Sequence, residues 1–213
     1  AGTNRGLVVH EPACDCLRGM NLPAWDEVDG VGVIVLAVVA HGDTVFAGLF
    51  GGGAVRFGPG NRTFEHVVRV DNRGDGLGAR MVRSLAVDAA GQLLIGTYGG
   101  AVQSARREAR VRGEPWRLES LPWAPTRTES RFAWSLEPAD DGLWIGTGSG
   151  LFRWNGRTLD AIDPRIESIR DTLRDADGRR WVASSFGLFE AVDDRLLPVA
   201  IADDDPGART PIV

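Results

Sequence analysis

Residues 85–102, which read LAVDAAGQLLIGTYGGAV, are the stretch that decides the fold, because the chain keeps returning to variations of them. An apolar strand is followed by an Asp/Gly turn, a bulky residue, a pair of small residues and a glycine step. The same order returns as LEPADDGLWIGTGSGLF at residues 136–152 and as LRDADGRRWVASSFGLF at residues 173–189. The pattern therefore predicts a repeated structural unit.

Two looser copies extend the repeat toward the N-terminus. Residues 36–57 keep the core of one bulky and two small residues, and residues 1–9 match only the back half of the unit. One small residue recurs in steps of 46, 48, 50 and 37 residues, at Gly2, Gly48, Gly96, Gly146 and Ala183. Steps of this length are typical of four-stranded propeller blades rather than of helical solenoids.

The sequence thus predicts an all-β fold, a β-propeller with about four full blades and partial blade strands at both ends. The apolar run at residues 30–40 is expected to be an inner strand buried on both faces. The whole chain is expected to form one propeller domain or a fragment of a larger propeller. The repeats are placed near residues 1–9, 33–70, 82–121, 131–162 and 169–201, with a partial strand at 210–213.

Composition excludes some classes of protein. The formal net charge is -5, whereas domains that bind nucleic acid usually carry a basic face, so no nucleic-acid partner is expected. The sequence has no run of about 18 apolar residues that could span a bilayer. It also has no basic and then apolar secretory leader, so any such signal is expected upstream of this chain.

The only two cysteines, Cys14 and Cys16, lie close to His10 and Glu11. A zinc site needs four ligands with paired spacing, and only three soft candidates are within this window. A disulfide between residues two apart would be strained. We therefore favour two free thiols and expect neither a metal nor a cofactor, with metal binding as the alternative.

These residues resemble the two-component regulator propeller repeats of bacterial sensor proteins. The resemblance covers nearly the whole chain and is weakest in residues 10–32. It rests on the segments 75–77, 82–85, 94–97, 143–147 and 150–151 and on Asp88, Gly91, Gly99, Gly100, Asp177, Gly178, Trp181, Gly187 and Leu188.

The resemblance implies a periplasmic or extracellular input domain that senses a ligand without catalysis. In such proteins the rest of a longer chain, for example a histidine kinase, or another subunit carries the signal onward. Propellers of this type usually have more blades than this sequence supplies, which favours a fragment. A closed five-bladed ring, with residues 210–213 paired beside residues 2–9, is the alternative.

The repeated positions are expected to be packing residues. Bulky rings fill the space between blades, small residues let neighbouring sheets approach, and the glycine before leucine permits a turn that other residues resist. Trp144 and Trp181 as platforms for sugar stacking are the less favoured alternative. The structural positions are Gly2, Gly48, Gly96, Trp144, Gly146, Gly150, Trp181 and Gly187.

The loops that lead into the inner strands of a propeller gather at one mouth of its channel, where ligand contacts are expected. Arginines recur in these loops, and they would suit an anionic ligand such as an acidic oligosaccharide or a partner's carboxylates. Solvated loop charges are the alternative. The predicted ligand-binding residues are Arg80, Arg83, Arg131, Trp134, Arg170, Asp171 and Arg209.

An enzyme is the main competing interpretation, because propellers also host lyases and hydrolases. Catalysis would need a general base, and His10, His41 and His66 are scattered in different contexts. No Ser/His/Asp arrangement and no pair of catalytic carboxylates stands out, so no catalytic residue is predicted. A propeller that only docks other proteins is a third class that the sequence does not separate from ligand sensing.

Overall fold

The computed structural model of the chain describes residues 2–3, 6–11, 15–20, 34–58, 64–68, 79, 81–100, 102–106, 116–121 and 131–200. The chain divides into two compact units, unit 1 with residues 1–124 and unit 2 with residues 125–213. The elements that build both units are β-strands. The described residues contain no helix that is long and apolar enough to cross a membrane.

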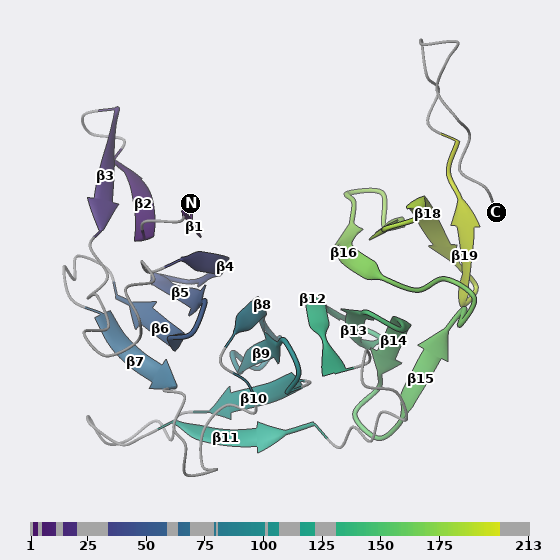
Figure 1. Ribbon diagram of the computed structural model, residues 1–213, viewed down its shortest axis with the longest axis horizontal. Coiled ribbons are helices and arrows are strands. Elements are labelled where there is room, and N and C mark those ends of the chain that lie inside the picture. The colour runs from purple at the N-terminus through teal and green to yellow at the C-terminus, as the bar shows by residue number, and fades with distance from the viewer. Residues whose placement is uncertain are drawn as a thin grey trace. The chain divides into compact units, whose positions relative to one another are not determined.

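Unit 1 holds three antiparallel sheets, each with its strands in chain order (Figure 1). The first sheet consists of β1 (Gly2–Thr3), β2 (Gly6–Glu11) and β3 (Cys16–Met20). The second consists of β4 (Val35–His41), β5 (Thr44–Leu49), β6 (Gly53–Phe57) and β7 (Phe64–Val68). The third consists of β8 (Val82–Val87), β9 (Leu93–Thr97), β10 (Val102–Arg106) and β11 (Arg117–Ser120).

Unit 2 holds two four-stranded sheets of the same design. One consists of β12 (Ala133–Ala139), β13 (Gly142–Thr147), β14 (Gly150–Trp154) and β15 (Leu159–Ile162). The other consists of β16 (Ile169–Arg174), β17 (Arg180–Ser184), β18 (Gly187–Val192) and β19 (Arg195–Pro198). Four-stranded antiparallel sheets joined by hairpins are propeller blades. The all-β propeller fold predicted from the repeats is confirmed.

Burial is concentrated in the middle strands of the sheets β4–β7, β8–β11 and β12–β15, whereas each strand of β16–β19 has one buried residue. All five residues of β9 are buried, as are the last four of β5. The first strands, β4, β8, β12 and β16, are the inner strands, and β4 is buried only at Val35, while Val38 is 41% exposed. The prediction of an inner strand buried on both faces is therefore wrong for the described residues 34–40. An inner strand is an edge strand, bonded to a neighbour on one side only.

Neighbouring sheets approach where a glycine of β1, β5 or β13 meets the first residue of the next inner strand. A Cβ atom built on Gly48 would lie 2.5 Å from Cγ1 of Val82, and one on Gly2 would lie 2.7 Å from Cγ1 of Val35. In unit 2, a Cβ atom on Gly146 would lie 2.8 Å from Cγ2 of Ile169. Only glycine leaves room for these branched side chains, which explains the recurrence of a small residue in each copy.

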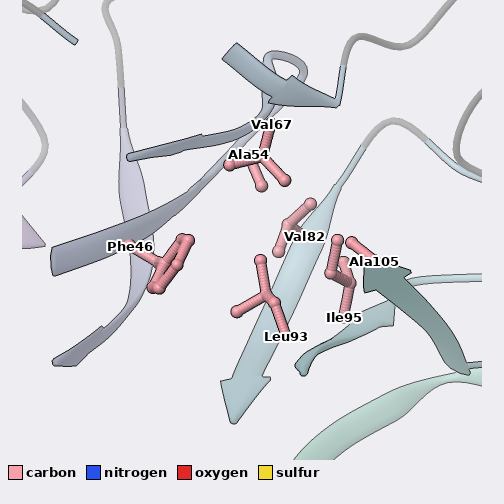
Figure 2. Close-up of a cluster of buried hydrophobic side chains, with 7 residues drawn as sticks. All are labelled: Phe46, Ala54, Val67, Val82, Leu93, Ile95 and Ala105. Carbon is pink, nitrogen blue, oxygen red and sulfur yellow. The ribbon is translucent and has the colours of Figure 1, made fainter. Parts of the chain in front are cut away.

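The core between the second and third sheets of unit 1 forms around this contact. Figure 2 shows Val82 with Leu93, Ile95 and Ala105 on one sheet, facing Phe46, Ala54 and Val67 on the other. All seven side chains are buried. A fully buried aliphatic or aromatic side chain contributes about 1.5–3 kcal/mol. These contacts between the two sheets therefore stabilise unit 1 by burying apolar side chains.

The two sheets of unit 2 pack through a similar cluster. Trp144, Leu151 and Ile162 of one sheet meet Ile169, Val182, Phe189 and Leu196 of the other. Trp144 is 4% exposed and its indole Nε1 donates a hydrogen bond to Asp141 Oδ1 at 3.0 Å. A tryptophan buried in this seam has no open face on which a sugar could stack, so the stacking alternative is wrong for Trp144.

Asp163 links the two sheets of unit 2 at the end of β15. Its buried carboxylate accepts hydrogen bonds from Nε and Nη2 of Arg165, both at 2.7 Å, and from the amide of Leu196 at 3.1 Å. The hydrogen bond from Arg165 lowers the pKa of Asp163 to about 2, against the cost of burial. The ionised carboxylate therefore stabilises the fold at neutral pH.

The low pKa of Asp163 predicts an acid-sensitive seam. Because the pKa is lower when folded than when unfolded, the contribution is fully present above about pH 5 and is lost as pH falls through about 4 to 2. We expect a loss of about 2 kcal/mol in the free energy of unfolding over this range. Urea denaturation at pH 5 and pH 2 measures it, and the variant Asp163→Asn should lose less between these two pH values. An equal loss in wild type and variant would contradict the assignment.

Candidate functional site

A β-bulge interrupts each of the four inner strands at the same place. In β8 the pairing moves from Val82 with Thr97 to Ser84 with Gly96, so Arg83 has no partner in the ladder. In β16 it moves from Ile169 with Ser184 to Asp171 with Ala183, and Arg170 is skipped. The residues skipped in the four strands are Leu36, Arg83, Trp134 and Arg170.

Bulges of this kind re-aim a side chain and are common beside binding sites. Arg83 and Arg170 are exposed, and Leu36 and Trp134 are half-buried. Three of these four residues, Arg83, Trp134 and Arg170, belong to the predicted ligand-binding set. We call the four positions the bulge positions. In each of these four sheets, the backbone pairing skips one residue, and the side chain of that residue is available for contacts.

The turn after each second strand lies beside the start of the inner strand. The amide of Phe50 donates to the carbonyl of Ile34 at 2.9 Å, and that of Tyr98 donates to the carbonyl of Met81 at 3.0 Å. The amide of Ser185 donates to the carbonyl of Ser168 at 3.1 Å in the same way. In these three sheets the turn is thus hydrogen-bonded to the residue two positions before the bulge position.

In unit 2, two bulge positions from neighbouring sheets meet. Cζ of Arg170 lies 3.9 Å from the ring centroid of Trp134, a cation–π contact. Nε of Arg170 donates a hydrogen bond to Oγ of Ser185 at 3.0 Å. Among the described residues, the two terminal nitrogens of this guanidinium have no hydrogen-bond partner. The stack and the hydrogen bond thus fix the plane of Arg170 while its terminal donors stay free.

The other predicted residues have different surroundings. Arg131 is exposed just ahead of β12, and Asp171 is exposed while its Oδ1 accepts a hydrogen bond from the amide of Thr172 at 2.9 Å. Arg83 belongs to unit 1 and is exposed. Arg80 and Arg209 lie outside the described residues. The structure therefore brings Trp134 and Arg170 into contact, with Asp171 next to them in the chain.

Exposed aromatic residues in the turns after the second strands were missed by the sequence analysis. Phe50 is 41% exposed, Tyr98 is 46% exposed and Phe186 is 58% exposed. Phe50 and Tyr98 directly follow the second strand in their repeats, and Phe186 follows one residue later. This recurrence was the available signal, because a large apolar side chain in a turn has no packing role that the repeat requires.

The described residues do not assemble a recognisable catalytic or metal centre. Nε2 of His10 lies 2.9 Å from Oδ1 of Asp15 in an exposed pair, and His41 is exposed at the end of β4. No group of three His, Cys, Asp or Glu side chains able to hold a metal occurs in the part of the chain that the structure describes. Cys16 opens β3 opposite Glu11, and Cys14 lies outside the described residues.

Two aspartates that lie in turns have shifted pKa values for structural reasons. The hydrogen bond from the indole of Trp181 lowers the pKa of Asp175. Burial raises the pKa of Asp141, but the hydrogen bond from Trp144 and the charges of Arg180 and Arg153 outweigh it, so this pKa is also lowered. A general acid needs a raised pKa, so these carboxylates are suited to holding turns rather than to proton transfer.

An open polar cleft of about 550 Å³ lies in unit 2, among the turns at the far ends of the inner strands. Its acidic lining residues are partly neutralised, because Arg174 lies 3.9 Å from Asp140 and Arg153 lies 3.6 Å from Asp141. The cleft is remote from the bulge positions along the strands. Its lining includes Asp140, Asp141, Arg174, Asp177, Arg179 and Glu190.

Comparison with solved structures identifies proteins of similar fold. The extracellular domain of a B. thetaiotaomicron protein assigned as a hybrid two-component system matches with a TM-score of 0.72 and 20% identity. The match covers 98% of this chain and 27% of that chain. The chain therefore spans about a quarter of this extracellular domain. The resemblance to sensor propellers expected from the repeats is confirmed at the level of the fold.

Lactonase-type proteins share the fold as well. A protein assigned as a gluconolactonase matches with a TM-score of 0.59 and 16% identity, over 92% of this chain and 70% of that chain. A protein of Bacteroides uniformis assigned as a 6-phosphogluconolactonase matches with a TM-score of 0.53 and 17% identity, over 84% and 57%. No family model and no curated protein matches the chain.

Proposed function

We propose that the chain supplies blades of a ligand-sensing propeller without catalytic activity, in the input domain of a two-component regulator outside the cytoplasm. The observation that carries this proposal is the bulge repeated in all four inner strands. A bulge weakens a ladder, so its repetition with varied side chains suits recognition better than packing. The similar fold of a two-component extracellular domain supports the same assignment.

The chemistry of the bulge positions favours an anionic ligand, which we propose to be an acidic oligosaccharide. Arg170 presents two terminal nitrogens, and a guanidinium binds a carboxylate through two parallel hydrogen bonds. Trp134 beneath it is a large apolar surface next to which a sugar ring can lie. Arg80, Arg83, Arg131, Asp171 and Arg209 are proposed to add contacts in their own repeats. The signal is then carried by the rest of a longer chain, such as a histidine kinase, or by another subunit.

Calorimetric titration with oligogalacturonate, and with a neutral oligosaccharide of equal length, tests this function. We expect the acidic sugar alone to bind and the variant Arg170→Glu to bind it about 10- to 100-fold more weakly, because a charge-assisted hydrogen bond contributes about 1.5–3 kcal/mol. Arg174→Glu is the matched control, since Arg174 is exposed at the other end of the same strand. Equal affinity in wild type and Arg170→Glu, or equal binding of the neutral sugar, would contradict the proposal.

A propeller lactonase is the second candidate, and the fold shared with two lactonase-type proteins favours it. Hydrolysis of glucono-δ-lactone, followed as proton release at constant pH with and without added divalent cations, separates the two functions. The sensing proposal predicts the uncatalysed rate under both conditions. Turnover that is saturable in lactone would favour the enzyme.

A further inference from the structure

A row of large apolar side chains lies in unit 1, beside one end of β4, β5, β8 and β9. The amide of Phe50 donates to the carbonyl of Ile34, and Phe50 also forms an antiparallel bridge with Met81. The amide of Tyr98 donates to the carbonyl of Met81, in the register that pairs β8 with β9. Residues directly opposite each other on antiparallel strands point to the same face. We call Ile34, Phe50, Met81 and Tyr98 the apolar row.

The two aromatic residues of the apolar row are the most exposed of its members. Phe50 is 41% exposed and Tyr98 is 46% exposed, whereas Ile34 and Met81 are half-buried. The row contains no charged residue. Aromatic side chains and methionine are enriched in binding surfaces, and methionine adapts its shape to a ligand. The row therefore has the composition of a contact surface.

The repeat itself does not require large side chains at these positions. By register, the corresponding residues of unit 2 are Phe132, Gly148, Ser168 and Ser185. The amide of Ser168 donates to the carbonyl of Gly148 at 3.0 Å, and the amide of Ser185 donates to the carbonyl of Ser168 at 3.1 Å. Small residues thus make the same kind of backbone contacts at three of the four positions. The exposed rings of unit 1 are therefore not needed to hold the turns.

The dimensions of the apolar row suit a short extended ligand. A stable interface between globular proteins takes about 20–30 residues on each side, far more than this row supplies. Neighbouring strands lie about 4.8 Å apart, so Phe50 and Tyr98, which are two strands apart, are separated by about 10 Å. A polyproline II helix repeats every three residues, or about every 9 Å. The two rings therefore match prolines at positions i and i+3 of such a helix.

We propose that the apolar row binds a proline-rich segment of another protein in the polyproline II conformation. Two prolines, three residues apart, lie on the rings of Phe50 and Tyr98, and Met81 contacts the residues between them. Proline brings neither a hydroxyl group nor an amide N–H that the row would have to satisfy, whereas a sugar needs polar partners for its hydroxyl groups.

The polyproline II helix is also preformed, so it loses little conformational entropy on a surface that buries little area. The inference does not rest on the sensing function, and it uses none of the residues proposed to bind an acidic sugar.

Calorimetric titration of the full chain with an oligoproline peptide tests the inference. Phe50→Ser and Tyr98→Ser should each weaken binding by about 10-fold, and the double variant should weaken it by about 100-fold. Serine is chosen because the fold accepts it at the corresponding position, Ser185. Phe186→Ser is the matched control and should leave the affinity unchanged, since Phe186 is 58% exposed but lies one residue beyond the corresponding position.

Further probes separate shape from stickiness. A peptide with proline at every third residue should bind about as tightly as oligoproline, whereas a Gly/Ser peptide of equal length, which is a flexible coil, should not bind. Phe50→Leu retains apolar bulk and removes the ring, and it should weaken oligoproline binding by about 3-fold. Thermal melting checks that each variant is folded.

Several results would overturn the inference. These are no binding of oligoproline, equal affinity in wild type and the double variant, or an equal loss of affinity in Phe186→Ser. Binding of a cello-oligosaccharide that is lost in Phe50→Ser would mean that the row holds a sugar instead. Oligogalacturonate should bind wild type and Phe50→Ser equally, so this test and that of the sensing function fail independently.

Discussion

The variant Gly48→Ala is expected to lower the free energy of unfolding of unit 1 by about 3 kcal/mol, at the upper end of the usual penalty for overpacking. A single added methyl group would lie 2.5 Å from Cγ1, 3.1 Å from Cβ and 3.3 Å from the backbone oxygen of Val82. Rotating the valine relieves only the first of these contacts. The backbone oxygen moves only if β8 moves, and β8 carries part of the buried cluster in Figure 2.

Urea denaturation followed by tryptophan fluorescence measures this loss. Gly19→Ala is the matched control, because no atom lies within 4 Å of a Cβ built on Gly19 and its backbone is not left-handed. Val82→Ala should be destabilising by itself but should reduce the cost of Gly48→Ala, since it removes the nearest atom. A stability for Gly48→Ala equal to that of Gly19→Ala would mean that the sheets are not held together at this point.

The success of the sequence analysis at this contact has a physical cause. Close approach of two sheets leaves no freedom in the choice of residue, so the small residue recurs visibly in Gly2, Gly48 and Gly146. The bounds of the repeats follow from the same regularity, and the repeat expected near residues 33–70 contains the sheet β4–β7. Glycine before leucine was also informative, because Gly150 and Gly187 have φ values of 136° and 135°, which side chains disfavour.

Features that depend on register or on a neighbouring sheet could not be predicted. The alternation of side chains in an inner strand is changed by its bulge, so the exposure of Val38 could not be read from the apolar run. An Asn-Gly pair usually forms the two central residues of a hairpin turn. The turn at Asn155-Gly156 is instead centred one residue later, because the amide of Asn155 donates to the carbonyl of Thr158. Hydrogen bonds made by the Asn155 side chain hold this shifted turn.

Only part of the candidate site could be predicted, because the rest depends on contacts between neighbouring sheets. Arginines ahead of the inner strands pointed to Arg83 and Arg170, and the structure places both at bulge positions. The contact between Arg170 and Trp134 joins residues of two sheets, which no local pattern encodes. Ser185, which holds Nε of Arg170, is a small polar residue in a turn and carries no signal by itself.

A second large effect is expected in the seam of unit 2. Arg180→Ala should lower the free energy of unfolding by about 3 kcal/mol, because removing one partner leaves a largely buried charge unpaired. The side chains of Arg180 and Glu137 are 11% and 14% exposed, and Nε of Arg180 lies 3.3 Å from Oε2 of Glu137. Cζ of Arg180 also lies 3.8 Å from the ring centroid of Trp144, so its loss exposes the buried indole.

The neighbouring variant Arg179→Ala is the control, since Arg179 is exposed in the adjoining turn and should change stability by less than about 0.5 kcal/mol. Arg180→Met with Glu137→Leu should recover most of the loss, because two apolar side chains of similar length fill the seam without a charge to desolvate. Recovery in the double variant but not in Arg180→Met alone would locate the cost in the unpaired Glu137. Equal losses of stability in Arg180→Met and in the double variant would instead assign the cost to the lost contact with Trp144. An Arg180→Ala variant as stable as wild type would contradict the role of Arg180 in this seam.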